Sequence, residues 1–161
     1  MHWLRKANID IVETIKSTKH LQKNLLRYIH SQNEYAHQMY QKMRLSMALL
    51  LRELEEIKFK TDPDIKILAI DSIKLSMKES DEVMNRDIDE LIRSGKVKPE
   101  TGSSMINDSF YLFEIKSNLI HFFETLFAAP ERKHTRAERK IALDEDEITQ
   151  IRGQSPQEKT T

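Results

Sequence analysis

The sequence predicts an all-α protein: an antiparallel bundle of four long helices, followed by a charged C-terminal tail. Three glycines and four prolines are too few for the turns that a chain of 161 residues would need if it formed sheets. Hydrophobic residues make up 39% of the chain and charged residues 32%, a mixture that suits helices with one apolar face and one solvated face. Apolar residues also recur at three- and four-residue spacing over long stretches, and the length suits one domain.

The first helix is predicted over residues 2–29. This stretch contains no glycine or proline, and its apolar side chains return to one face that we expect to be buried. The positions on this face are Leu4, Ala7, Ile11, Ile15, Thr18, Leu25 and Ile29.

The second helix is predicted to begin at Ser31 and to end near Phe59. Ser31 and Glu34 have the spacing of a capping box, in which each side chain accepts a hydrogen bond from the other residue's free backbone amide. The expected buried stripe consists of Ala36, Met39, Tyr40, Met43, Met47, Leu50, Leu54 and Ile57.

The third helix is predicted to begin at Pro63, because Asp62 accepts first-turn amides and proline has no amide to leave unpaired. It should end where Gly95 adopts a left-handed conformation. Its expected stripe is Ile65, Leu68, Ile73, Met77, Met84, Ile88 and Leu91.

The fourth helix opens at Lys98-Pro99-Glu100 and ends before Pro130. Its apolar band is too broad for one neighbour and suits contact with two helices. The band consists of Met105, Ile106, Phe110, Leu112, Phe113, Leu119, Ile120, Phe123, Leu126 and Phe127. Connections of two to five residues predict antiparallel neighbours.

We therefore divide the chain into a helical bundle, residues 1–130, and a charged tail, residues 131–161. The tail is basic from Glu131 to Lys140 and then carries four consecutive acids, Asp144 to Glu147. Low hydrophobicity and high charge predict little packed structure there.

Composition excludes several classes of function. The chain has no cysteine, and its three glycines match no phosphate-binding loop. Zero net charge argues against a nucleic-acid partner, because phosphate contacts require a basic excess. The longest strongly apolar run, Leu45 to Leu51, is far short of the roughly 20 residues that a membrane span needs. The N-terminus lacks the apolar stretch of a signal peptide, so we expect a cytoplasmic location.

The Glu-x-x-His spacing of di-metal helical bundles occurs twice. Glu34 and His37 form one pair, but Glu34 is assigned to the helix cap. Glu131 and His134 form the other pair, in the tail. We predict no catalytic residues and no cofactor, because no deep cleft with a positioned acid and base can be derived from these spacings.

Two stretches point to a known family. The first runs from Lys19-His20 to Leu25, and the second contains Asn107-Asp108-Ser109 within residues 105–111, followed by residues 116–120. Together they resemble the PhoU-like C-terminal domain of bacterial sodium/phosphate cotransporters. The similarity in order, helix lengths and the connection at residues 95–100 covers roughly residues 10–128.

The resemblance implies a non-catalytic regulatory domain associated with phosphate transport. Its partner would be a membrane-embedded phosphate transporter, either upstream in the same chain or a separate protein. The domain would then lie at the inner face of the cytoplasmic membrane. PhoU itself has two repeats of three helices, so four helices represent only part of that architecture. Apolar stripes on the second and fourth helices also allow a homodimer.

PhoU proteins bind metal clusters through Glu/Asp-x-x-x-Asp motifs. No acid in this chain has a second acid four residues later. The nearest candidates are Asp81 with Asn85 and Glu114 with Asn118, in which an amide replaces one anionic ligand. We therefore predict no metal site of the PhoU type.

The alternative hypothesis is a metal-binding or metal-storage helical protein. It rests on the acids gathered within twelve residues of the third helix: Glu79, Asp81, Glu82, Asp87, Asp89 and Glu90. A solvated helix face explains the same pattern.

Overall fold

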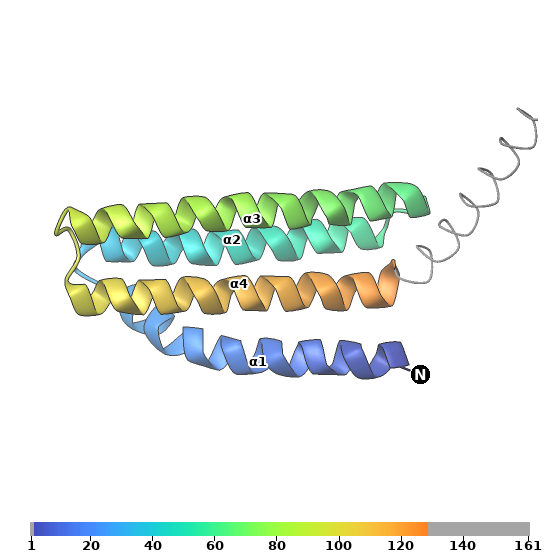
Figure 1. Cartoon of the computed structure of the whole chain (residues 1–161), viewed down its shortest axis with the longest axis horizontal. Coiled ribbons are helices and arrows are strands. Elements are labelled where there is room, and N and C mark those ends of the chain that lie inside the picture. Colours follow the sequence, from blue (N-terminus) through green and yellow to red (C-terminus); the bar gives the residue numbers. More distant parts are fainter. Residues whose placement is uncertain (1, 129–161) are drawn as a thin grey trace, which may run out of the picture.

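The computed structural model describes the backbone of residues 2–128 and the side chains from residue 4 onward. The described helices are α1 (His2–Tyr28), α2 (Glu34–Lys58), α3 (Pro63–Arg93) and α4 (Pro99–Phe127). Successive helices run in opposite directions (Figure 1). The predicted antiparallel bundle of four long helices is confirmed. The tail predicted at residues 131–161 lies outside the described residues.

The start of α2 corrects one prediction. Asn33 is the N-cap, and its Oδ1 accepts a hydrogen bond from the amide of Ala36 at 2.9 Å. The Ser31 hydroxyl instead accepts from the amide of Asn33 at 3.1 Å, within the preceding turn. The Glu34 carboxylate accepts from the Gln38 side chain at 2.9 Å. The capping box of Ser31 and Glu34 was therefore wrong, because Ser31 belongs to the turn and a better cap follows it.

The ends of α3 confirm the predictions from local chemistry. The Asp62 side chain accepts from the amides of Asp64 at 2.9 Å and Ile65 at 3.3 Å, and Pro63 occupies the first helical position. Gly95 has a φ of 67°, and its amide donates to the carbonyl of Ile92 at 3.1 Å. A left-handed glycine at this position satisfies carbonyls that the end of a helix leaves free.

The four helices are not equivalent in their packing. In Figure 1, α2 and α3 lie on one side of α4, and α1 lies on the other side. α1 packs mainly along α4, contacts α2 much less, and makes no packing contact with α3 among the described residues. α4 is therefore the central helix. Its broad apolar band serves three neighbours, one more than the sequence predicted.

The apolar core has two parts. One part uses side chains from all four helices, including Leu21 and Tyr28 of α1. The other part lies near the end where α4 finishes, and only α2, α3 and the end of α4 contribute to it; it includes Ile70, Phe123 and Ala128. The N-terminal half of α1 consequently contributes nothing to either apolar cluster.

The predicted buried stripe of α2 is confirmed, with Met47 half-buried and the other members buried. The stripe of α1 was partly wrong. Leu4, Ile15 and Thr18 are exposed, whereas Asp10 and Ser17 are buried. The reason is that α1 rests on α4 through positions seven residues apart, and several of these positions carry polar side chains.

The stripes of α3 and α4 need smaller corrections. Ile65 and Leu68 are exposed, and Ile70 is buried in their place. Ile106 and Phe110 of α4 are also exposed. These apolar residues spread over a wider arc than the neighbouring helices cover. None of the four described helices contains an apolar stretch that could span a lipid bilayer.

Candidate functional site

Three polar side chains in the middle of α4 lie inside the bundle, and Thr125, near the end of the helix, is a fourth buried polar residue. Asp108, Ser109 and Lys116 are only 1%, 2% and 7% exposed. They are enclosed because α4 contacts each of the other helices. A buried polar group costs free energy unless it finds hydrogen-bond partners, so the partners of these three residues define the site.

Asp108 joins α4 to two other helices. The Tyr40 hydroxyl of α2 donates to Asp108 Oδ2 at 2.5 Å, and the Asn24 amide of α1 donates to Oδ1 at 3.3 Å. Burial raises the pKa of Asp108, while these two hydrogen bonds act to lower it. Burial and the adjacent carboxylate also raise the pKa of Tyr40, so its hydroxyl stays a donor.

Ser109 continues the polar contacts toward α3. Its hydroxyl lies within hydrogen-bond distance of Asn85 Oδ1, at 2.8 Å, and of the Ile106 carbonyl, at 2.9 Å. Asn85 in turn donates to Asp81 Oδ2 at 3.0 Å. Burial raises the pKa of Asp81, whereas the charge of Lys116 and the bond from Asn85 oppose that shift. Asp81 and Asn85 are thus a hydrogen-bonded pair connected to the centre of the bundle.

Lys116 is the third polar residue of this central group. Its ammonium group donates to the hydroxyl of Ser46 on α2. Burial lowers the pKa of Lys116, and the charges of Asp81 and Glu53 partly restore it. No carboxylate of the described chain forms an ion pair with this ammonium within 4 Å. Lys116 therefore carries a buried charge that nearby hydrogen bonding only partly satisfies.

A cleft of about 340 Å³ lies directly beside Lys116, between α2 and α3. Its walls are mainly apolar, and the hydroxyls of Ser46, Ser76 and Ser80 interrupt them. An ion pair between Lys42 and Asp87, 2.8 Å long, borders the cleft. The cleft therefore combines a cationic group, hydroxyl groups and apolar surface.

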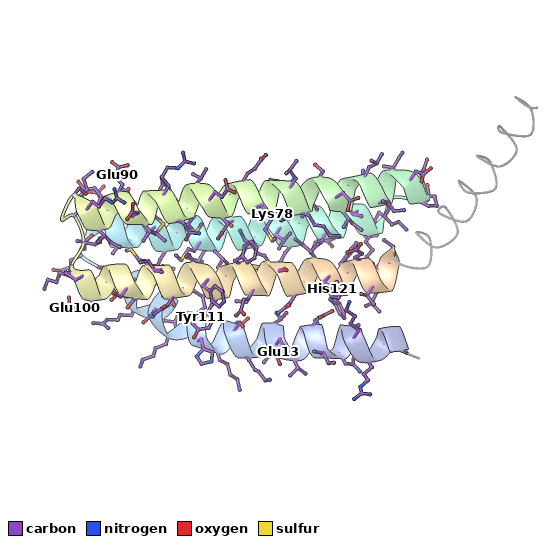
Figure 2. The ribbon with its side chains drawn as sticks, viewed as in Figure 1. Glu13, Lys78, Glu90, Glu100, Tyr111 and His121 are labelled. Atoms are coloured by element: carbon purple, nitrogen blue, oxygen red, sulfur yellow. The ribbon has the colours of Figure 1, made fainter. Side chains whose placement is uncertain are left out.

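The contact between α1 and α4 is a ladder of polar pairs. His121 Nδ1 donates to Asp10 Oδ2 at 2.6 Å, and Ser17 Oγ donates to Glu114 Oε2 at 3.2 Å. Asn24 with Asp108 forms the next rung. Figure 2 shows Tyr111 and His121 at the side of α4 that faces α1. On α1 the three rungs are seven residues apart, the repeat of a helical pair that stays in register.

The two stretches behind the family resemblance meet in space. Asn24 contacts Asp108, and the ring of His20 stacks on Tyr111 with 4.9 Å between centroids. Lys19 and Asn107 are exposed, so the structure brings only part of each stretch into this contact.

The remaining predicted positions do not form a common site. His37 Nδ1 donates to the Ile29 carbonyl at 2.6 Å, and Glu34 has its own bond to Gln38, so the Glu34 and His37 pair does not converge. Glu114 faces α1, whereas Asn118 borders a different hollow between α3 and α4. Within residues 2–128, no three His, Asp or Glu side chains gather closely enough to hold a metal ion. Glu131 and His134 lie outside the described residues.

Sequence reasoning missed Lys116 and Tyr40 as polar members of the site. Lys116 lies four residues after Leu112 and four before Ile120, both of which are buried. A lysine in register with buried apolar residues is the signal that would have identified it. Tyr40 was predicted as core, and the structure adds its hydroxyl contact with Asp108.

Fold and site define an all-α bundle whose central helix carries a buried polar centre. Comparison of the chain with models of protein families, with curated proteins and with solved structures gives no match.

Proposed function

We propose that the chain is a PhoU-like, non-catalytic regulatory domain that acts on a membrane-embedded phosphate transporter through direct contact. The observation that carries this proposal is the packing of residues 19–25 against residues 105–111. Asn24 binds Asp108 and His20 stacks on Tyr111, so two stretches far apart in sequence form one structural feature. We take their joint resemblance to one family as support for the proposal, because the two stretches lie together in the folded chain.

The surface between α1 and α2 supports action through protein contact. A groove of about 720 Å³ lies there, and Leu112, Ile115 and Leu119 of α4 are among the residues that line it. Leu51, on its wall, is 51% exposed. Arg44 is the one charged residue among those that line it. A groove with so little charge suits an apolar segment of the transporter as its partner.

The contact can be tested with a photo-crosslinking amino acid at position 51, in cells that contain the transporter. We expect a crosslink between the chain and the transporter. The matched control is position 75, because Leu75 is similarly exposed but lies on α3 and does not line the groove. Position 75 should give no such crosslink. Crosslinks from position 51 only to a second copy of the chain, or equal crosslinking from both positions, would contradict the proposal.

A further inference from the structure

The cleft beside Lys116 contains hydrogen-bond donors that the folded chain does not fully satisfy. An ammonium group has three N–H donors. The Lys116 ammonium makes one hydrogen bond, to Ser46, among the described residues. Its side chain is more than nine-tenths buried, yet it borders the cleft. Two donors of this ammonium group therefore have no described hydrogen-bond partner beside the cleft.

The charges around the cleft leave Lys116 as the group most available to a ligand. Lys42 and Asp87 neutralise each other at 2.8 Å. Asp81 accepts from Asn85 and does not line the cleft, and Glu53, which does, is exposed; their charges act on Lys116, but neither forms a described ion pair with it. An anion beside Lys116 would therefore meet a buried positive charge in a medium where charge interactions are stronger than in water.

The remaining walls determine what the rest of the ligand must be. Leu49, Met77 and Val83 are among the side chains that line the cleft, and its volume of about 340 Å³ exceeds what a small inorganic ion would fill. The hydroxyls of Ser46, Ser76 and Ser80 provide additional donors along the cleft. Apolar walls with a few polar groups are typical of sites for small organic molecules.

We propose that this cleft binds an amphipathic organic anion, with its carboxylate on the Lys116 ammonium and its apolar body against the walls of α2 and α3. The proposal is independent of the transporter contact, which uses the groove on the other side of α2. A ligand here would contact α2, α3 and α4 at the middle of the bundle. Asn85, which bonds to both Asp81 and Ser109, belongs to the same part of α3.

Titration calorimetry on the full chain tests the proposal with octanoate as the probe. Octanol has the same apolar body without the charge, and inorganic phosphate has charge without the apolar body. We expect octanoate to bind roughly tenfold more tightly than octanol, as a charge-assisted hydrogen bond predicts, and more tightly than phosphate. Octanol binding as tightly as octanoate, or phosphate binding as tightly, would overturn the proposal.

Variants locate the site. Lys116→Met should reduce octanoate affinity to the level of octanol, while circular dichroism and thermal unfolding show an intact bundle. Lys78→Met is the matched control. Lys78 lies on α3 (Figure 2), is exposed, and lines a different hollow from Lys116. It should leave octanoate affinity unchanged. Should Lys116→Met unfold, Ser76→Ala provides a milder change that is expected to weaken octanoate binding. Wild-type octanoate affinity in a folded Lys116→Met variant would contradict the assignment.

Discussion

At the scale of single residues, Asp108 contributes to the way in which the stability of the bundle depends on pH. Burial raises its pKa above the ordinary value of 3.8. The folded state then holds the proton more tightly than the unfolded state does, so this contribution to stability is complete below the ordinary pKa. It is lost as the pH rises through the raised pKa.

The raised pKa of Asp108 predicts how stability changes when its carboxyl group is removed. Asparagine cannot ionise, so the Asp108→Asn variant should gain stability relative to the wild type as the pH rises from acid to neutral. Denaturant unfolding of both proteins over a series of pH values measures the difference in free energy of unfolding. A difference that stays constant, or that grows in favour of the wild type, would show that Asp108 is not destabilised by ionisation in the fold.

A second prediction concerns the hydroxyl that contacts Asp108. Tyr40→Phe removes the donor at 2.5 Å and leaves a buried carboxylate with Asn24 as its one described donor. The expected loss is about 1–3 kcal/mol of stability, the usual cost of an unsatisfied buried group. Tyr28→Phe is the control, because Tyr28 stacks on Tyr40 at 4.9 Å and its hydroxyl makes no described hydrogen bond. Equal losses in the two variants would contradict the assigned role of the Tyr40 hydroxyl.

The sequence led to two of the three buried polar residues at the middle of α4 and not to the third. Asp108 and Ser109 were selected because of a family resemblance, and both are buried at the centre of the site. Lys116 was missed because a lysine in an amphipathic helix is normally placed on the solvated face. Its register with Leu112 and Ile120 indicates a buried face, but the local pattern does not show that α2 and α3 cover the whole side chain.

At the scale of helices, α1 is the element whose packing differs most from the prediction. Its N-terminal half is outside both apolar clusters and is held by the polar rungs of Asp10 with His121 and Ser17 with Glu114. These part-buried polar contacts contribute less to stability than the burial of apolar side chains. Periodicity predicted the helix but not this face, because the face is set by contact with α4.

This packing predicts that backbone amides are protected from hydrogen exchange to different degrees across the bundle. Amides between residues 7 and 17 of α1 should exchange hydrogen faster than amides between residues 109 and 120 of α4, since opening α1 exposes little apolar surface. Hydrogen exchange followed by NMR measures each amide separately. Equal protection in the two segments would mean that α1 opens only with the whole bundle.

A further prediction at this scale concerns the approach of α4 to α3. A Cβ at Gly102 would lie 2.5 Å from Ile92 Cγ1 and 2.8 Å from Cδ1. Gly102→Ala should therefore destabilise the bundle, because overpacking of about 1–3 kcal/mol exceeds the gain in helix propensity of about 1 kcal/mol. Thermal unfolding provides the measurement.

The same substitution in an Ile92→Ala background should reverse its sign. The clash is then absent and the propensity gain remains. Destabilisation by Gly102→Ala in both backgrounds would show that contact with Ile92 is not the cause.

At the scale of the whole molecule, the order and direction of the helices followed from local signals. Asp62-Pro63 and Gly95 act within one turn, so their effects can be derived from sequence. The groove between α1 and α2 could not be predicted in the same way. It exists because α1 packs mainly on α4 and contacts α2 little, a property of the assembled bundle.

We propose that this groove transmits regulation to a phosphate transporter, and the uptake of labelled phosphate by cells tests this proposal. Leu51→Glu places a charge in the groove, whereas Leu75→Glu places the same charge on the exposed face of α3. We predict that cells with Leu51→Glu take up phosphate at the altered rate of cells lacking the chain, and that Leu75→Glu preserves the wild-type rate. Wild-type uptake with a folded Leu51→Glu variant, or unchanged uptake when the chain is deleted, would contradict the claim.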